Sequence, residues 1–559
     1  MKSSHIEKER KFDGLVDAAF PALDGLPGVA EVSDPGVEDL DAVYYDTVGL
    51  RLLEHGVTLR RRTGGHDAGW HLKLPAGPDR RREEQLPLSA GAPGRVPRAL
   101  TQRTRAYARG EKLVPIVHLR THRLRRLLLD SEHRSLAEVA QDAVSAQVLG
   151  PERFPAEAAR AARPVIPAQR NGTADHNSSS HSGSRSSGSS AVLTAWTEVE
   201  AELVRGDTEL LDAVEQALAR VGLRRSVSRS KLARALGRET AGPATSGLRG
   251  PAAQAADVSA GGRSPEDRSI GGVVTALLRG QTEQLIALDP AVRADEADAV
   301  HRMRVAVRRL RSTLRSHRRL LADEPCQALA EELRWLGAVL GEARDREVLG
   351  ARLGAEIGRL PEAECPGPVR ERIDGWASAE YRRSWKRAVV TLDSPRYFIL
   401  LDGLEALAAG PPLRGRARRG AVAEFRRTAR REQRRVARRL AEASAAPAGP
   451  QHDQALHGAR KAAKRARYAA EGARPTVGKP AKRLARRMKD LQELLGERQD
   501  ALLACAALPE LAAAAHRAGE QGFGYGVLYA GQRAAVAEAD RRLPAARRAA
   551  GKRRLTRFR

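Results

Sequence analysis

The chain is 559 residues long and 42% hydrophobic, so it has enough apolar material for about two to four packed domains. It carries 97 Lys and Arg against 69 Asp and Glu, and this net charge of +28 favours a polyanionic partner such as nucleic acid, an anionic membrane or polyphosphate. Its three cysteines are far apart, which excludes a disulfide framework and a zinc site. Neither a run of about 18 apolar residues nor an apolar leader stretch occurs, so we expect a cytoplasmic protein without membrane insertion.

Residues 1–239 are expected to form one domain that consists mainly of strands. Short alternating segments broken by Gly and Pro, such as 57–62, 70–75 and 83–88, predict strands, and the pattern resumes at 195–204 before a helix at 207–221. Residues 171–190 are rich in Ser and low in complexity, which predicts a loop. The composition then shifts to Ala, Gly, Pro and Ser, so we expect a flexible linker over 240–267.

Charged residues alternate along the predicted strands. Glu7, Glu9 and Lys11 share one face of a strand, where two neighbouring carboxylates are unfavourable unless a cation lies between them. A divalent metal with oxygen ligands is the natural cation for such a pair. The same alternation recurs at Arg60 and Arg62, His71 and Lys73, Arg81 and Glu83, Arg123 and Arg125, and Glu198, Glu200 and Glu202.

The opposite faces of these strands are apolar, as at Leu59, Leu72, Leu74, Val199 and Leu203. This pattern predicts a barrel with a polar lumen and an apolar outer face that helices cover. A lumen with cationic and anionic walls matches a triphosphate bound with a metal, because Arg and Lys bind phosphate oxygens while carboxylates hold the metal.

These residues resemble the CYTH family of triphosphate tunnel enzymes, whose opening signature Glu-x-Glu-x-Lys is met by Glu7, Glu9 and Lys11. Further matches follow in family order over residues 3–237: Tyr44-Tyr-Asp-Thr47, Leu59-Arg-x-Arg62, Trp70-His-Leu-Lys73, Glu83, Asp142, the acidic run at 198–202 and Ser230-Lys231. The resemblance implies an eight-stranded antiparallel barrel with a through-tunnel that needs Mg²⁺ or Mn²⁺.

The same resemblance implies roles for single residues. The metal ligands would be Glu7, Glu9, Asp142, Glu198 and Glu200, and the phosphate ligands would be Arg60, Arg62, Lys73, Arg123, Arg125 and Lys231. Lys11 would help to activate the attacking water, in a catalytic set with Glu9 and Arg62. The loop at 171–190 precedes the last acidic strand and is placed to cover one tunnel mouth, and the many arginines of 120–126 leave the strand register there open.

After residue 267 the composition changes to segments rich in Ala, Leu, Arg and Glu. This change predicts an all-helical domain over 268–545, followed by a basic tail at 546–559. The expected helices are 270–288, 295–321, 328–353, 421–446, 454–473 and 479–507. The fold class is therefore a multidomain α+β chain, with a β-barrel first and a helical bundle second.

The helical region contains an internal repeat. One group of residues has the same spacing as a second group: His301, Arg304, Arg308, Arg309 and Arg311, and then His457, Arg460, Lys464, Arg465 and Arg467. Each group precedes a related segment, Leu340-Gly-Glu-Ala-Arg-Asp345 or Leu495-Gly-Glu-Arg-Gln-Asp500. The separation is 44 residues from His301 to Asp345 and 43 from His457 to Asp500, so we expect a duplicated helical unit.

Each repeat places cations along one stripe of a helix. Within an arc of about 80°, one stripe holds His301, Arg304, Arg308 and Arg311, and the other holds His457, Arg460, Lys464 and Arg467. Stacked cations repel one another unless they are solvated or face a polyanion, and two halves related by a pseudo-twofold axis would turn the stripes into one cationic channel. Aromatic residues are only 4% of the chain, so the stacking platforms of nucleic-acid binders are missing and we do not expect that partner. Guanidinium groups suit a chain of phosphates better.

The paired motifs and the Leu-Gly-Glu segments resemble the CHAD domain family, over about residues 268–545. The resemblance implies a duplicated helical domain that binds polyphosphate through the eight residues of the two stripes. One departure is Gln499, which stands where the first copy has Arg344.

The first hypothesis for the whole chain is a metal-dependent hydrolase of inorganic tripolyphosphate or short polyphosphate, that is, an inorganic triphosphatase. A fused polyphosphate-binding domain would raise the local concentration of such a substrate. One alternative is a non-catalytic polyphosphate-binding or granule-associated protein. Another is a CYTH enzyme for a different triphosphate, namely thiamine triphosphate, or ATP as an adenylate cyclase.

Overall fold

A computed structural model describes residues 3–13, 20–77, 79–92, 94–149, 193–238, 269–365 and 367–558. The chain divides into two compact units, Met1–Arg249 and Gly250–Arg559. The predicted Ser-rich loop at 171–190 and the predicted linker at 240–267 lie outside the described residues. Within the described ranges, no helix combines the length and the apolar character that crossing a membrane requires.

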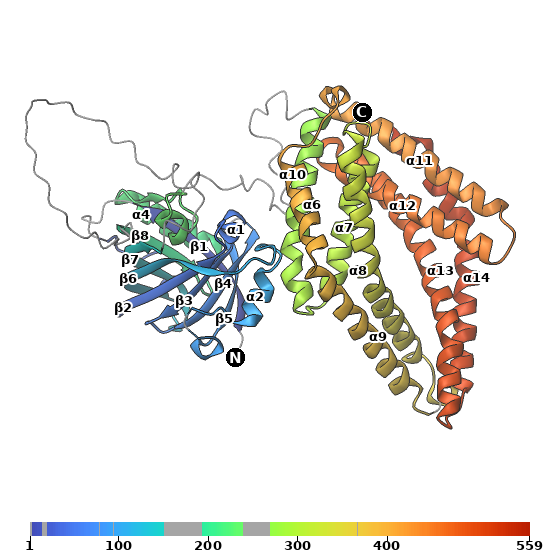
Figure 1. The fold of residues 1–559 in the computed structure, drawn as a ribbon, viewed down its shortest axis with the longest axis horizontal. Coiled ribbons are helices and arrows are strands. Elements are labelled where there is room, and N and C mark those ends of the chain that lie inside the picture. The colour runs from blue at the N-terminus through green and yellow to red at the C-terminus, as the bar shows by residue number, and fades with distance from the viewer. Residues whose placement is uncertain are drawn as a thin grey trace, which may run out of the picture. The chain divides into compact units, whose positions relative to one another are not determined.

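The first unit is a closed antiparallel β-barrel (Figure 1). The strands pair in the order β5-β4-β3-β2-β6-β7-β8-β1, and pairing of β1 with β5 closes the ring, which confirms the predicted eight-stranded barrel. A two-residue strand, β9 (Arg224–Arg225), pairs with the end of β1. The eight strands are β1 (Ser3–Asp13), β2 (Glu31–Asp46), β3 (Thr58–Thr63), β4 (Gly69–Gly77), β5 (Arg80–Leu86), β6 (Val114–Leu129), β7 (Ser135–Val148) and β8 (Leu193–Leu203).

The outer face of the barrel is apolar where a helix covers it. α4 (Thr208–Arg220) packs Leu211 and Val214 against Phe12, Val139 and Val199, and all five side chains are buried. Asp207 caps this helix, because its carboxylate accepts a hydrogen bond from the amide of Leu210. Three shorter helices are α1 (Arg51–Glu54), α2 (Arg98–Thr104) and α5 (Lys231–Ala235).

One end of the barrel interior is also apolar. Tyr44, Leu119 and Val144 pack there, and Leu232 of α5 joins them in one buried cluster. The charged residues therefore occupy the interior beyond this apolar layer, and α5 links the two regions.

The second unit is entirely helical among its described residues, apart from short 3₁₀ turns and isolated bridges. Its helices are α6 (Ile270–Arg293), α7 (Ala299–Ser316), α8 (Asp323–Ile357), α9 (Val369–Leu392), α10 (Pro395–Ala409), α11 (Ala421–Ala445), α12 (Pro450–Val477), α13 (Lys479–Arg517) and α14 (Phe523–Ala550). The six predicted helices are all present, and α9, α10 and α14 add to them.

The packing of these helices repeats. In the first half α6 packs on α7, α7 on α8 and α8 on α9, and in the second half α11 packs on α12, α12 on α13 and α13 on α14. Figure 1 shows α8 with α9 and α13 with α14 as two long hairpins. α7 and α12 contact each other, so the two stripe-bearing helices meet between the halves.

The last residues belong to this packed unit. α14 continues to Ala550, and a 3₁₀ turn follows at Arg553–Thr556. Leu555 and Phe558 are buried, and the turn contacts α11 and α13. Much of the segment 546–559 is therefore folded against the bundle.

Candidate functional site

Antiparallel pairing brings the charged residues of the first domain onto the inner face of the barrel. Lys11 lies opposite Glu200, and Arg123 lies opposite Asp142. Residues that face each other across an antiparallel ladder point to the same side of the sheet. Arg125 lies on this side too, so the pairing fixes the register of the arginine-rich segment 120–126.

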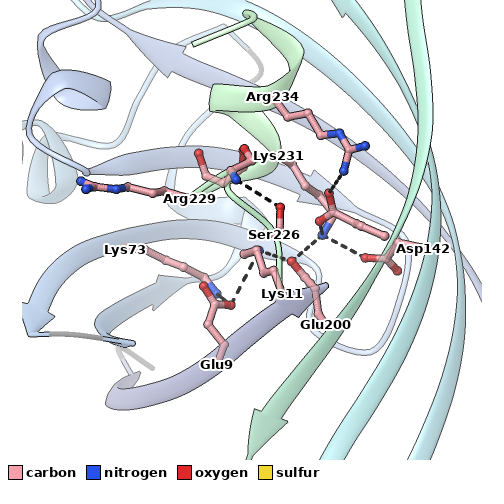
Figure 2. A network of polar contacts seen from close by, with 12 residues as sticks. Glu9, Lys11, Lys73, Asp142, Glu200, Ser226, Arg229, Lys231 and Arg234 are labelled. Atoms are coloured by element: carbon pink, nitrogen blue, oxygen red, sulfur yellow. Dashed lines mark hydrogen bonds and ion pairs between the residues drawn. The ribbon is translucent and has the colours of Figure 1, made fainter. Parts of the chain in front are cut away.

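Three carboxylates, Asp142, Glu198 and Glu200, meet around the ammonium group of Lys231, and Figure 2 shows two of them, Asp142 and Glu200. Lys231 Nζ lies 2.9 Å from Asp142 Oδ2, 2.9 Å from Glu198 Oε1 and 2.6 Å from Glu200 Oε1. Burial alone would lower the pKa of Lys231, but the three negative charges raise that pKa well above its ordinary value. We call Asp142, Glu198 and Glu200 the carboxylate cluster.

A short helix fixes the ammonium in place. Lys231 is the first residue of α5, and the hydroxyl of Ser230 accepts a hydrogen bond from the amide of Ala233 at 3.1 Å. This is an N-cap, which holds the first turn of the helix. Leu232 anchors the other side of α5 in the apolar layer, so the direction of Lys231 is set from both sides.

Two further cations pair with the carboxylate cluster. Arg123 donates two hydrogen bonds of 2.7 Å to Asp142 and one of 2.8 Å to Glu200. Lys11 also bonds to Glu200 and lies 3.9 Å from Glu9 (Figure 2). Burial would raise the pKa of Glu200, but Lys11, Lys231 and Arg123 hold it well below its ordinary value.

A second group of charges gathers on β1, β4 and β5. Lys73 Nζ lies 2.6 Å from Glu7 and 3.9 Å from Glu9, and His71 Nδ1 lies 2.7 Å from Glu83. Burial raises the pKa of Glu7 to about 9, and the neighbouring Glu83 adds to the shift. For Glu9 the effect of burial is outweighed by Lys11 and Lys73, which lower its pKa to about 2.

The remaining predicted phosphate ligands form a cationic wall. Arg60 donates a hydrogen bond to the hydroxyl of Tyr44 at 3.2 Å, and Arg125 bonds to Glu138 at 2.8 Å and Glu38 at 3.1 Å. Arg62 pairs with Asp67. Burial, followed by repulsion from Arg60 and Arg123, lowers the pKa of Arg62 to about 9, so an anion near these groups would be favourable.

The carboxylate cluster fits a divalent metal. One oxygen from each of its three residues lies within 4.8 Å of the others, and hard cations such as Mg²⁺ and Mn²⁺ prefer carboxylate oxygens. The predicted ligands do not all meet there, because Glu7 lies with His5 and Glu83 in a second group, and Glu9 lies between Lys11, Lys73 and Arg81. The alternation of charge places Arg81, Glu83 and Glu202 on the lumen face, but the sequence gave these three residues no role. Burial raises the pKa of Glu202 to about 7.

The second domain contains a cavity of about 370 Å³ between its two halves. Four helices line it, α7 and α8 from the first half and α12 and α13 from the second. The basic residues that line it are His301, Arg304, Arg308, Arg344, Arg460, Lys464 and Arg467. The two basic stripes thus meet in one pocket, which we call the interhelix pocket.

Six of the eight predicted stripe residues line the interhelix pocket. The other two, Arg311 and His457, are half-buried outside its lining. Arg344, which sequence reasoning did not assign to a site, does line it, and pairs with Glu347 at 2.9 Å and Asp298 at 3.7 Å rather than with Asp345. Tyr468 was also missed, since a single tyrosine in a helix gives no signal.

The interhelix pocket holds more basic than acidic residues, and its lining carboxylates are Asp345, Glu493 and Asp500. Burial, followed by repulsion from Arg308, Arg460 and Arg304, lowers the pKa of Lys464 to about 6. Arg308 donates a hydrogen bond of 2.6 Å to the hydroxyl of Tyr468. Among the described residues, the Nε groups of Arg304 and Arg460 are buried without a hydrogen-bond partner, which leaves part of each guanidinium group unsatisfied.

Known proteins resemble this chain in both parts. The family model of the CYTH domain matches residues 5–235, and that of the CHAD domain matches residues 276–509. Two Mycobacterium tuberculosis proteins, MT2285 of strain CDC 1551 / Oshkosh and Rv2226 of strain ATCC 25618 / H37Rv, are each 36% identical over 530 residues, or 94% of this chain and 92% of theirs. Among solved structures, PptA from Streptomyces chartreusis has a TM-score of 0.42 at 22% identity, covering 50% of this chain and 99% of its own. The CHAD domain from the plant Ricinus communis has a TM-score of 0.40 at 26% identity, covering 50% and 92%.

Proposed function

Because the chain belongs to the family of proteins that join a CYTH domain to a CHAD domain, we propose that its barrel hydrolyses inorganic tripolyphosphate or short polyphosphate with Mg²⁺ or Mn²⁺. CYTH domains belong to the triphosphate tunnel metalloenzymes, so an enzymatic role is the family's expectation. The helical CHAD domain would bind polyphosphate and bring it to the barrel. Association with polyphosphate granules in the cytoplasm would follow from that binding.

The observation that carries the proposal is that a closed barrel holds both clustered carboxylates and several cations in its interior. Asp142, Glu198 and Glu200 gather oxygen ligands on one wall, and Arg60 and Arg62 stand on another. A binding site for phosphate alone would need the cations and not the clustered carboxylates. The combination supports a site for a metal together with a phosphate chain.

In the proposed reaction, a water oxygen attacks a terminal phosphorus and the phosphoanhydride P–O bond breaks. A metal held by the carboxylate cluster would supply charge neutralisation for the phosphate oxygens. The phosphates would be bound by the predicted cationic ligands, namely Arg60, Arg62, Lys73, Arg123, Arg125 and Lys231. Lys11, between Glu9 and Glu200, would orient the attacking water, and the proton that the water loses would pass to the departing phosphate oxygen.

The test is release of phosphate from tripolyphosphate by the full chain with Mg²⁺ or Mn²⁺, beside Glu9→Ala and Glu200→Gln. Glu132→Gln is the matched control, because this glutamate lies at an exposed turn between β6 and β7. We expect release by the native chain and the control, and about a hundredfold less by the two site variants. No release with either metal would refute the hydrolase, and faster release from thiamine triphosphate, or cyclisation of ATP, would reassign its substrate.

A second candidate, binding without catalysis, is favoured by one feature. The ammonium of Lys231 already sits among the three carboxylates at 2.6 to 2.9 Å, where a metal would otherwise neutralise them. If that arrangement persists with a phosphate chain bound, the barrel would hold polyphosphate without a metal. Equilibrium binding of Mn²⁺ to the chain, with and without a non-hydrolysable triphosphate analogue, distinguishes the metal-dependent hydrolase from a protein that only binds polyphosphate. A protein that only binds polyphosphate should retain no Mn²⁺ in either measurement.

A further inference from the structure

The Leu-Gly segments of the repeat meet the basic stripes at equivalent points. Gly341 lies on α8 opposite Arg304 of α7, and Gly496 lies on α13 opposite Arg460 of α12. A β-carbon at Gly341 would lie 3.4 Å from Nε and from one terminal nitrogen of Arg304. At Gly496 it would lie 3.2 Å from a terminal nitrogen of Arg460. In each half, the guanidinium group thus lies over a glycine of the facing helix.

An aspartate stands one helical turn beyond each glycine. Asp345 Oδ1 lies 3.3 Å from Arg304, and Asp500 Oδ1 lies 3.8 Å from Arg460. These contacts are long for Arg–carboxylate hydrogen bonds, which are usually about 2.8 Å. They orient the guanidinium groups without satisfying them fully, since Nε of both arginines is buried and has no hydrogen-bond partner among the described residues.

Glycine is a costly residue at both of these positions. α8 spans 35 residues and α13 spans 39, and each glycine is a buried position inside its helix. Glycine in a helix interior is unfavourable relative to alanine. The same unfavourable residue recurs in both halves, where an arginine of the interhelix pocket lies against the facing helix. An added β-carbon would be crowded at Gly496, at 3.2 Å, and in ordinary contact at Gly341, at 3.4 Å, so a larger side chain is needed to displace Arg304.

We propose that Gly341 with Asp345, and Gly496 with Asp500, are positioning residues that aim Arg304 and Arg460 into the interhelix pocket to bind a phosphate chain. Each glycine lets the guanidinium lie flat on the backbone of the facing helix, and each aspartate fixes its rotation. The two glycine–aspartate pairs act on one ligand, because Arg304 and Arg460 line the same cavity. This inference rests on the proposed binding of polyphosphate by the helical domain.

The experiment measures the affinity of the full chain for long-chain inorganic polyphosphate while the side chain at Gly496 grows, from Gly496→Ala to Gly496→Leu, and likewise at Gly341. We expect the affinity to fall with size, reaching about tenfold for Leu, the loss of one charge-assisted hydrogen bond. The slope of log affinity against log salt should fall by about one, as for other polyanions that lose a cationic contact. Thermal stability should not fall for the Ala variants, since alanine is the better helix former.

Gly375→Ala and Gly375→Leu are the matched controls, because Gly375 is an exposed glycine inside α9 with no atom within 4 Å of its added β-carbon. They should bind polyphosphate like the native chain. Folded Gly496→Leu and Gly341→Leu variants with native affinity and salt slope would overturn the positioning role while leaving polyphosphate binding intact. A native chain that does not bind polyphosphate would overturn both.

Asp345→Asn and Asp500→Asn give an independent arm. Each change adds positive charge to the interhelix pocket, so a purely electrostatic role for the aspartates predicts tighter binding. The positioning role predicts weaker binding, because the arginine loses its charged anchor. Tighter binding would therefore overturn the role of the aspartates.

Discussion

The ammonium group of Lys231 occupies the position in the carboxylate cluster that a divalent metal ion would take. Its ammonium contacts three buried carboxylates, and it was predicted as a phosphate ligand. For Lys231 to reach a phosphate, it must leave the carboxylate cluster, and a metal can then take its position. Metal and phosphate chain would therefore bind cooperatively. The metal frees Lys231 to bind phosphate, and the phosphate draws Lys231 away from the carboxylates that bind the metal.

The Lys231→Gln variant tests this exchange. Without added metal we expect it to lose about 3–5 kcal/mol of stability, because three buried carboxylates lose a buried counter-charge. Mn²⁺ should restore more stability in the variant than it adds to the native chain, since the ion no longer competes with an ammonium. Thermal unfolding with and without Mn²⁺ measures both quantities, and an equal Mn²⁺ effect on the two proteins would contradict the exchange.

Lys464 predicts a pH dependence of polyphosphate binding. Its pKa is lowered to about 6 by burial and then by Arg308, Arg460 and Arg304, so the free pocket holds it largely neutral at pH 7.5. A bound polyanion favours the ammonium form, and binding then takes up a proton. Affinity should therefore rise as the pH falls from 8 towards 6, by at most about tenfold per pH unit for one proton, and level off below.

Affinity measurements at pH 6, 7 and 8 and constant salt check this dependence. Lys464→Arg keeps the charge at all three values, so it should flatten the profile. A profile as steep in the variant as in the native chain would assign the pH dependence to His301 and His457, whose pKa values are also lowered by burial.

At the scale of residues, the sequence was most informative where charge alternated. Glu9 and Lys11, two residues apart on a strand, were predicted to face the lumen, and their pairing with β8 places them there. What alternation could not give is the partner of each charge. That Glu7 lies by Glu83 depends on how β1 and β5 close the ring, which is a long-range register.

Among the elements, α5 is the shortest helix that carries a site residue. It has five residues, too few to be stable alone, so it depends on the cap by Ser230 and on the burial of Leu232. Ser230→Ala removes the cap and should cost about 1 kcal/mol of stability. It should also lower tripolyphosphate hydrolysis, because Lys231 loses its fixed direction.

Asp207→Ala is the matched control for this change. It removes the N-cap of α4, which covers the outer face of the barrel, and should cost a similar amount of stability without affecting hydrolysis. Stability from denaturant unfolding and rates from phosphate release separate the two effects. Equal loss of hydrolysis in both variants would mean that the cap acts through overall stability alone.

The prediction of helices succeeded where the hydrophobic periodicity was strong and failed where proline or glycine interrupts a helix. α13 was expected to end at residue 507, but it continues through Pro509 to Arg517, because packing against α14 outweighs the lost hydrogen bond. α14 contains Gly524, Gly526 and Pro544, which hid its helical character in the sequence. The repeat was more reliable, since its spacing predicted a duplicated helical unit, and α7 and α12 meet as expected for two halves that pack about a pseudo-twofold axis.

For the whole molecule, the fusion of two different folds predicts a division of labour. Arg460→Ala with Lys464→Ala weakens the interhelix pocket and should raise the KM for long polyphosphate by about tenfold or more, since tethering raises the local concentration of a chain that both domains hold. The KM for tripolyphosphate should stay unchanged, because three phosphates are too short to be held by both domains at once. Initial rates on the two substrates check this, and a parallel rise in both KM values would show that the pocket supports the barrel in another way.

The shift in composition near residue 240 was enough to separate the two units, because strand alternation and helical periodicity are different signals. Duplication within the second unit was also visible, since both halves keep a histidine, an arginine and an aspartate at matching distances. The sequence also showed that the two halves differ, because Arg344 of the first half corresponds to Gln499 of the second. It did not show how this difference affects the interhelix pocket. The structure shows Arg344 lining the interhelix pocket while it pairs with Asp298 and Glu347 on the first-half side.

The basic lining of the interhelix pocket bears on the direction in which a polymer can bind. Nucleic acids and peptides have a polarity, so a site for them must present different groups to their two ends. Inorganic polyphosphate has no polarity: its repeating unit and its two ends are the same in either sense. Because the chain reads the same in either sense, it binds the interhelix pocket in two equivalent orientations even though the two halves differ, as at Arg344 against Gln499. Capture therefore does not depend on which end arrives first.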